Sequence, residues 1–371
     1  MQENAFHKFS EKLLQKSVFP YLKEYLLNKN IPVPISVNLD LTSACSNRCD
    51  YCIDKMVLNT GKFLSLNYIK KLIGDWKEKG LKSVIIIGGG EPTLHPQFEE
   101  VIKFLKGLSL EVGIVSNGAK IEKIKNVCHL FRENDWVRFS IDAGKDSTFQ
   151  TLHHPQIKIT LESVLRGAKQ MREICPKLQI GYSFLIIGDG KYLNNIKEIS
   201  LAAKLAKENS FSYFSLKPII TPDASRKTEI SPKNLAEIRA QIKKAKKLES
   251  PKFKVVESVN LLLFYDKKLK KLMQKQPKTC HIQFFRAIIN PNGVFACSSW
   301  RGFENLKIAD KYDSQFAKKR KKIAKSFDAD KTCKEVHCLY APLNCWIEEI
   351  IGNKNKINEL KPIDDFGDYF L

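Results

Sequence analysis

The sequence contains no long apolar run, no internal repeat and no low-complexity linker. Its longest apolar candidates, such as residues 261–264, are far shorter than the ~18 residues of a membrane span. A secretory signal is also missing, because the chain starts with a polar and charged segment. These absences argue against a membrane protein and against a secreted one, and they predict a cytoplasmic location.

Arginine is scarce, although the net charge is +22 and the pI is about 9.4. Most of the excess is scattered lysine, with the densest clusters at residues 243–247, 267–271 and 318–322, in polar, helix-like segments. Arginine is the residue preferred for bidentate contacts to bases and phosphates. Solvated helix faces are therefore the favoured interpretation of the charge, and RNA or another acidic partner is the alternative.

The chain has 371 residues and ten cysteines. This length can bury a large core and suggests one large domain plus a smaller one. An apolar content of 43% is ordinary for a globular protein. Many cysteines without a signal peptide indicate a reducing compartment, in which thiols serve as metal ligands or catalytic groups.

Strand-like and helix-like segments alternate from about residue 35 onward. The strand-like runs lie at residues 35–41, 83–87, 111–116, 136–142, 178–187 and 211–218. Helix-like stretches lie near residues 65–79, 97–107, 120–131, 158–173 and 193–208. This alternation predicts parallel strands with right-handed crossovers. Because no clear seventh and eighth unit follows, the α/β fold is predicted to be a partial (β/α)6 TIM-like barrel.

The segments outside this alternation differ from it in character. An amphipathic helical lead-in, which Pro20 is expected to break, precedes the barrel and is expected to pack against it. A hairpin with an Asn292-Gly293 turn follows the lysine-rich region. The expected division is a lead-in at 1–34, the barrel core at 35–220, a helical connector at 221–275, a small α+β extension at 276–350 and a tail at 351–371.

Three cysteines, Cys45, Cys49 and Cys52, share one short loop after the first strand-like run, with C-x3-C-x2-C spacing. Three thiolates can hold three irons of a [4Fe–4S] cube and leave the fourth iron open to a small molecule. A zinc site is the first alternative, but zinc normally takes four ligands with paired C-x2-C spacing. Disulfides are the second, and they do not suit a reducing compartment.

With Tyr51 directly before its last cysteine, this loop resembles the signature of the radical S-adenosylmethionine (SAM) enzymes. The resemblance implies that SAM chelates the open iron through its amino and carboxylate groups. Reductive cleavage then gives methionine and a 5′-deoxyadenosyl radical, which abstracts a substrate hydrogen atom. A reductant such as flavodoxin or ferredoxin is expected as a partner.

Later motifs match the same family in the expected order. The run at residues 88–92 resembles the family's GGE motif, in which Gly89, Gly90 and Glu91 would hold the amino group of the methionine part. Ser116 and Ser140 end the third and fourth strand-like runs, where family members place a hydroxyl near the ribose or carboxylate. The resemblance further implies an adenine contact at Ile187 and at Tyr51. Taken singly, each of these segments is also an ordinary strand-end turn.

The late cysteines resemble the SPASM/twitch extensions of this superfamily. Cys280 precedes the hairpin, Cys297 follows its glycine turn, and Cys333 and Cys338 match the closing pair. The resemblance implies one auxiliary [4Fe–4S] cluster, with Cys345 as the competing ligand and a zinc site as the alternative. Cys128 and Cys175 are expected to be ordinary thiols without partners.

The expected function is therefore that of a radical SAM enzyme that oxidises or rearranges a small metabolite with the help of an auxiliary cluster. The alternatives are a peptide-modifying maturase, an RNA-modifying radical SAM enzyme, and a non-enzymatic zinc- or cluster-bearing binding protein. No catalytic residue is assigned from the sequence. His153 and His154 lie in a loop that faces either substrate or solvent.

Overall fold

The computed structural model describes residues 7–188, 190, 192–220, 230–273, 276–311, 313, 315–333 and 338–371. The predicted lead-in at 1–34, barrel core at 35–220, connector at 221–275 and extension at 276–350 therefore each lie partly outside the described residues. No helix within the described ranges is both long and apolar enough to cross a membrane.

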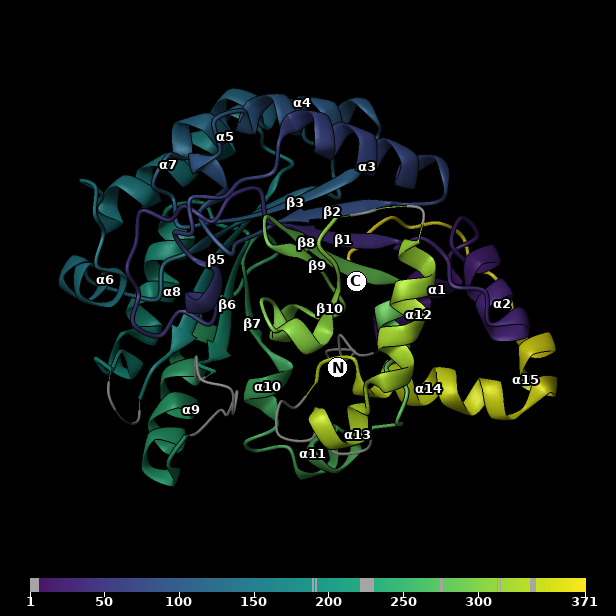
Figure 1. Cartoon of the computed structure of the whole chain (residues 1–371). Coiled ribbons are helices and arrows are strands. Elements are labelled where there is room, and N and C mark those ends of the chain that lie inside the picture. Colours follow the sequence, from purple (N-terminus) through teal and green to yellow (C-terminus); the bar gives the residue numbers. More distant parts are fainter. Residues whose placement is uncertain are drawn as a thin grey trace.

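A single sheet holds every named strand of the described residues (Figure 1). Its parallel strands are β1 (Ser36–Leu39), β2 (Ser83–Ile86), β3 (Glu111–Ser116), β4 (Trp136–Ser140), β5 (Gln179–Ile186), β6 (Tyr213–Pro218), β7 (Lys254–Glu257) and β8 (Arg286–Asn290). The antiparallel strands β9 (Gly293–Phe295) and β10 (Lys307–Ala309) follow β8. The order across the sheet is β10-β9-β8-β1-β2-β3-β4-β5-β6-β7, which is open rather than closed.

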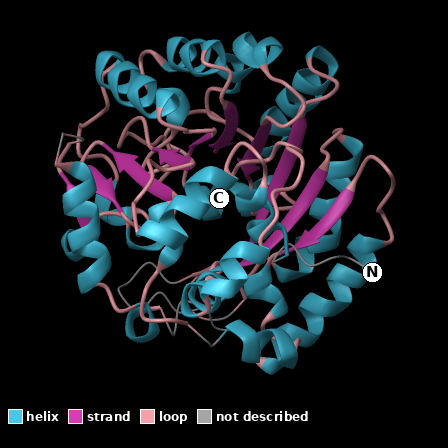
Figure 2. Ribbon diagram, turned by 90° about the vertical axis from the view of Figure 1, so that its right-hand side faces the viewer, coloured by secondary structure: helices cyan, strands magenta, loops and turns pink. Residues whose placement is uncertain are grey.

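Helices cover the outer side of this curved wall of strands (Figure 2). They are α3 (Leu66–Glu78), α4 (Phe98–Gly107), α5 (Ile121–Val127), α6 (Asp146–His153), α7 (Leu161–Ile174), α8 (Ile199–Glu208) and α9 (Pro232–Lys246). Alternate residues of each strand, such as Val137 and Phe139 of β4, are fully buried against these helices. The residues between them must face the inner side, because successive side chains of a strand point to opposite faces.

The predicted α/β fold class with a partial, open barrel is confirmed, and the first six strands lie where the sequence placed them. Two expectations about the remainder were wrong. The segment expected to be a helical connector also contributes β7, a short strand that extends the sheet beyond β6. The hairpin expected in a separate extension begins with β8, which pairs in parallel with β1 and so continues the barrel sheet.

A second core lies between the two ends of the chain. It joins α1 (His7–Leu14) and α2 (Phe19–Asn28) to α12 (Phe316–Ser326), α13 (Ala329–Thr332), α14 (Ala341–Gly352) and α15 (Lys354–Glu359). The buried side chains Leu22 and Tyr25 of α2 pack in this core with Phe285 and Ile347. Pro20 lies in the first turn of α2, where a missing N–H costs little, so it starts that helix. The lead-in therefore packs mainly with the C-terminal helices, rather than with the barrel as expected.

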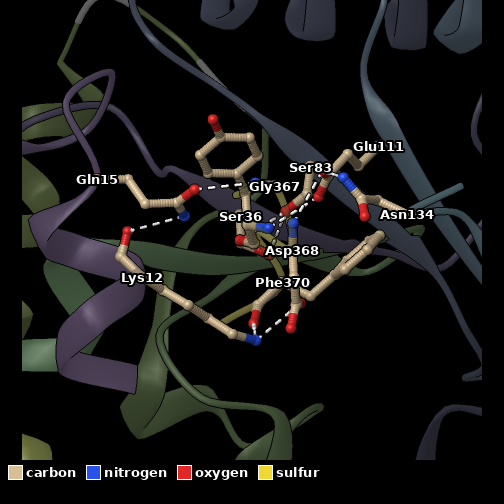
Figure 3. Close-up of polar contacts among 10 residues, drawn as sticks. Lys12, Gln15, Ser36, Ser83, Glu111, Asn134, Gly367, Asp368 and Phe370 are labelled. Atoms are coloured by element: carbon tan, nitrogen blue, oxygen red, sulfur yellow. Dashed lines mark hydrogen bonds and ion pairs between the residues drawn. The ribbon is translucent and has the colours of Figure 1, made fainter. Parts of the chain in front are cut away.

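The last residues of the chain lie beside the N-terminal ends of β2 and β3 (Figure 3). The Glu111 carboxylate accepts hydrogen bonds from the backbone N–H groups of Asp368 and Tyr369, at 2.9 and 2.8 Å. Lys12 donates to the Asp368 carboxylate at 2.8 Å and to the Phe370 carbonyl at 2.7 Å. Phe370 is buried with its ring centroid 5.4 Å from that of Trp136. The tail therefore closes this end of the barrel.

Replacing Glu111 with Ala should lower the free energy of unfolding by roughly 1–3 kcal/mol, because two backbone N–H groups lose their acceptor. Chemical denaturation of the two proteins measures this difference. The control is Glu122→Ala, since the Glu122 side chain is 71% exposed and pairs only across a helix surface. Equal losses for the two variants would contradict the role assigned to Glu111.

Candidate cofactor site

The cysteine loop leaves the C-terminal end of β1, the edge of a parallel sheet at which ligands usually bind. The loop is held from several sides. The Cys45 N–H donates to Asn59 Oδ1 at 3.0 Å, the Arg48 N–H donates to the His153 carbonyl at 2.9 Å, and the Glu91 N–H donates to the Ala44 carbonyl at 2.7 Å. These contacts fix the path of the loop without using any of the three thiols.

The thiols of this loop lie close together and are poorly suited to ionise by themselves. Burial raises the pKa of Cys52 to about 12, and it raises the pKa of Cys49 well above that of a free thiol. The neighbouring thiolates of Cys52 and Cys45 and the carboxylate of Asp142 raise the pKa of Cys49 further. A bound cation would remove this repulsion, since thiolates are the form that binds iron. The donor set therefore fits an iron–sulfur cluster.

His153 lies against Cys49, a contact that the sequence did not specify. Its Nε2 lies 2.8 Å from the Ile141 carbonyl, so this nitrogen carries the proton. Its Nδ1 lies 3.2 Å from Cys49 Sγ and accepts from the thiol in the cluster-free chain. The imidazole is buried, whereas its neighbour His154 is turned toward solvent near Asp50.

Glu91 joins the ends of β2 and β3. Its carboxylate is buried and accepts from Thr93 Oγ1 at 2.7 Å, Ser116 Oγ at 2.8 Å and the Asn117 N–H at 2.7 Å. Burial raises the pKa of Glu91, and these hydrogen bonds oppose that rise. Glu91 and Ser116 are thus brought together as predicted for one site, and both also hold the backbone around it. Their contacts to a cofactor remain predictions.

The glycines before Glu91 allow the loop to approach β2. A Cβ atom on Gly90 would lie 2.2 Å from the Thr42 carbonyl oxygen and 2.7 Å from that of Ala44. A Cβ atom on Gly89 would lie 3.3 Å from Asp40 Oδ2. Any side chain at Gly90 would therefore push against the start of the cysteine loop. The glycine run is required for the site's shape, whether or not it touches a ligand.

Tyr51 and Ile187 share a small apolar cluster beside Cys49, although 136 residues separate them in the sequence (187 − 51). The Tyr51 hydroxyl donates to Asp142 Oδ2 at 2.9 Å, and the Leu185 N–H donates to Asp142 Oδ1 at 2.7 Å. Asp142 thus joins the loop to the ends of β4 and β5. The sequence predicted Tyr51 and Ile187 for one adenine contact, and the structure brings them together.

Ser140 ends β4 on the inner face and is half-buried, directly opposite Ser183 of β5. Asn117, which looked like a turn residue, lies next to the cysteine loop, with its Nδ2 3.3 Å from Ser46 Oγ and 3.9 Å from Cys45 Sγ. Its position directly after Ser116 in a strand-end turn is the only local signal that could have indicated this.

An arginine from the C-terminal segment also reaches the cysteine loop. Arg301 Nε lies 2.7 Å from Asp40 Oδ2, and its Nη1 contacts both oxygens of Asp54 at 2.8 and 2.9 Å. The side chains of Arg301 and Asp40 are 4% and 0% exposed, so this ion pair is buried. Burial raises the pKa of Asp40 to about 7, and the Arg301 charge opposes that rise. Sequence reasoning missed this link because nothing local to Arg301 indicates it.

The late cysteines form a second group of thiols. Burial raises the pKa of Cys338 to about 11, and the Cys297 thiolate raises it further. The pKa values of Cys280 and Cys333 are also raised, first by burial and then by Cys338 and Cys297. The structure thus brings the four predicted auxiliary ligands within electrostatic reach of one another. Among the described residues, no three His, Cys, Asp or Glu groups are close enough to hold a single metal ion.

Cys345 lies on α14 and is half-buried. The side chain of Asn344, next to it, faces Cys280, with Nδ2 3.9 Å from Cys280 Sγ. The expectation that Cys128 and Cys175 lack partners was wrong. Their sulfurs lie 3.0 Å apart, on the outer side of the barrel.

Residues 39–203 match the family model of the Radical SAM superfamily. This segment contains the cysteine loop, the Gly-Glu run and the ends of β3, β4 and β5. The resemblance drawn from the cysteine loop and the Gly-Glu run is therefore confirmed for this radical SAM segment, and the late cysteines lie outside it.

Curated relatives match parts of the chain. The chain is 32% identical over 131 residues to an S-adenosylmethionine-dependent nucleotide dehydratase of Flammeovirga pacifica, covering 33% of this chain and 43% of the relative. It is 28% identical over 140 residues to a tungsten-containing aldehyde ferredoxin oxidoreductase cofactor-modifying protein of Pyrococcus furiosus, covering 37% of this chain and 39% of the relative. The chain thus spans less than half of the length of these relatives.

Solved structures extend the similarity of fold. Streptococcus suis SuiB bound to its precursor peptide SuiA superposes with a TM-score of 0.63 at 13% identity, covering 100% of this chain and 82% of that one. The enzyme anSMEcpe with bound AdoMet gives a TM-score of 0.58 at 13% identity, covering 88% of this chain and 98% of that one. At such identities the likeness concerns the fold alone.

Replacing Arg301 with Met should lower the free energy of unfolding by about 3 kcal/mol or more, because buried Asp40 loses its counter-charge. Adding Asp40→Asn to this variant should restore part of the loss, and a double-mutant cycle measures the coupling. The control is Arg166→Met, since the Arg166 side chain is 66% exposed and its ion pair lies on the surface. Additive effects at Arg301 and Asp40 would rule out the link.

Proposed function

We propose that this chain is a radical SAM enzyme whose cysteine loop holds a [4Fe–4S] cluster through Cys45, Cys49 and Cys52. The observation that carries the proposal is the set of three close thiols at the C-terminal edge of β1, within a radical SAM domain. When bound, the cluster and SAM supply a 5′-deoxyadenosyl radical that takes a hydrogen atom from the substrate.

The protein's own contribution is to hold and shield these groups. Glu91, through its hydrogen bonds to Ser116 and the Asn117 N–H, keeps the strand ends beside the loop in one arrangement. Gly89 and Gly90 supply backbone close to the loop, where carbonyl groups could accept from the ammonium group of SAM. Tyr51 and Ile187 offer an apolar contact for adenine, and they also keep water from that side.

Cys280, Cys297, Cys333 and Cys338 are proposed to hold one auxiliary [4Fe–4S] cluster. Support comes from the closeness of these thiols, because Cys297 and Cys338 raise the pKa values of Cys280 and Cys333, and Cys297 raises that of Cys338. A cube has four irons, so four thiolates would fill its corners. A zinc site built from the same thiols is the alternative.

The proposed substrate is a small metabolite, which the enzyme would oxidise or rearrange. A peptide is the second candidate, favoured by the coverage of the whole chain by the fold of SuiB, which is seen with the peptide SuiA. The reductant would be a flavodoxin or a ferredoxin. Candidate compounds can be ranked by how strongly each stimulates formation of 5′-deoxyadenosine.

Replacing Cys45, Cys49 and Cys52 together with Ala should abolish 5′-deoxyadenosine formation, because the cluster loses all of its protein ligands. The measurement is the yield of 5′-deoxyadenosine from anaerobically reconstituted protein with dithionite and SAM. The matched control is Cys128→Ala together with Cys175→Ala, which removes thiols on the outer side of the barrel. Wild-type yields from the triple variant would refute the proposal.

Iron content should distinguish the two groups of thiols. The reconstituted wild type should carry about eight irons per chain, and the Cys45/Cys49/Cys52 variant should carry about four, one cube fewer. Replacing Cys333 in that variant should remove the remaining iron, whereas replacing Cys345 should not. The reverse result would change the ligand assignment, and zinc in place of iron would eliminate the auxiliary cluster.

A further inference from the structure

Among the described residues, two basic side chains on the inner face of the barrel form no ion pair with a carboxylate. Arg138 belongs to β4 and Lys217 belongs to β6, with β5 between them. Their strand neighbours Val137, Phe139, Phe214 and Leu216 are fully buried against the outer helices. Because successive side chains alternate, Arg138 and Lys217 face the inner side of the sheet.

The register of the strands stacks these groups one above the other. Arg138 is level with Gly181 and Tyr213, while Lys217 is level with Leu185, nearer the C-terminal edge. Between these two levels lie Ser140 and its cross-strand partners Ser183 and Ser215, which form a rung of hydroxyl groups. The inner wall therefore presents a guanidinium, three hydroxyls and an amine in order toward the cofactor edge.

Two aromatic rings pack on the inner face, that of Trp136 below Arg138 and that of Tyr213 level with it. The Trp136 ring lies where a Cβ atom on Gly113 would come within 2.3 Å of it, and the Tyr213 ring lies within 2.2 Å of such an atom on Gly181. Glycine at these two positions thus makes room for the rings. The Arg138 guanidinium lies over the Trp136 ring, with its carbon 5.5 Å from the ring centroid. The three serines and Lys217 lie nearer the C-terminal end of the inner face than these two rings.

Solvent reaches the inner face of β4, β5 and β6 beside these rings. Arg138, Ser140, Leu185 and Lys217 are each only half-buried, although every neighbour on the helix side of these strands is fully buried. Val256 of β7 is 44% exposed and lies beside Ser215 on the same inner face. Side chains on this part of the inner face are therefore partly exposed to solvent.

The two cations are close enough to disfavour each other. The Arg138 charge is the largest cause that lowers the pKa of Lys217, to about 7, followed by burial. Asp142 opposes this effect only in part, and its carboxylate already accepts from Tyr51 and Leu185. Arg138 Nε is buried without a hydrogen-bond partner. Uncompensated charges of this kind cost stability unless a ligand neutralises them.

We infer that Arg138 and Lys217 bind an anionic group of the substrate, a phosphate or a carboxylate, within the barrel. An anion between them would restore the balance of charge through charge-assisted hydrogen bonds. The three serine hydroxyls between the two levels could donate to the same group. Assigning the anion to the substrate rests on the proposed radical SAM function, whereas the anion site itself does not.

The carboxylate of SAM is the other source of the same chemistry, because Ser140 is also a predicted cofactor contact. The affinity for SAM and the affinity for small anions distinguish these two sources. For a substrate site, Lys217→Met should weaken the binding of pyrophosphate or succinate and leave the affinity for SAM unchanged. If the variant loses affinity for SAM and keeps its affinity for both small anions, the inference is overturned.

The binding experiment uses the full, anaerobically reconstituted chain and titration calorimetry with pyrophosphate and with succinate. Lys217→Met should weaken the binding of whichever anion the wild type binds by about tenfold or more. The control is Lys204→Met on the outer helix α8, whose side chain is 62% exposed, and it should match the wild type. Failure of the wild type to bind either anion, or equal affinities in Lys217→Met and wild type, would overturn the inference.

Chemical labelling of the unaltered protein tests the same site without a variant. An amine with its pKa near 7 is about half unprotonated at pH 7, far more than an ordinary lysine, so Lys217 should react with acetic anhydride faster than the surface lysines. Bound pyrophosphate or succinate should slow this reaction at Lys217 and leave Lys204 unaffected, as read by peptide mass spectrometry. No protection at Lys217 by either anion would contradict the inference.

The anion site and the radical SAM function can be refuted independently of each other. Loss of anion binding in Lys217→Met, with the wild-type affinity for SAM, concerns the anion site alone. Wild-type 5′-deoxyadenosine formation by the Cys45/Cys49/Cys52 variant would instead refute the radical SAM function, whatever the result for anions.

Discussion

The parallel pairing of β8 with β1 is the contact on which the rest of the structure depends. β1 ends at the cysteine loop, and β8 leads into the hairpin that precedes Cys297 and Arg301. Because the two strands lie in register from Ser36 and Arg286 onward, both thiol groups are held relative to one sheet. Arg286 also donates to Asn38 across this pairing and to Tyr340 near the second group.

Buried ion pairs also hold the C-terminal segment against the cysteine loop. Arg301 contacts Asp40 before the cysteines and Asp54 after them, so one guanidinium spans the base of the loop. Separating the C-terminal segment from the barrel would leave Asp40 buried and unpaired, which is costly. The auxiliary segment and the cysteine loop are therefore expected to move as one unit rather than as independent domains. This coupling would keep a constant separation between the two clusters that we propose.

Local patterns in the sequence were enough for the first six strands and for the cofactor motifs. Cys45, Cys49 and Cys52 lie within one short loop, and Glu91 directly follows its glycines, so their grouping needs no knowledge of distant segments. The seventh strand was missed because Lys254–Glu257 is short, with only one fully buried residue. Arg301, His153 and the contact between Cys128 and Cys175 depend on register and helix packing, which a linear pattern does not encode.

A linear pattern also does not show which basic residues lie inside the barrel. The sequence drew attention to dense lysine clusters, such as residues 318–322, which lie on helices. Lys217 is a single lysine in a strand, and only its register with Leu185 places it inside the barrel. The buried acids Glu91, Asp40 and Asp142 all have partners within the chain, whereas Arg138 and Lys217 form no ion pair with any carboxylate of the described residues. Two inner cations whose charge the described residues offset only in part, through Asp142, are suited to receive a negative charge from outside.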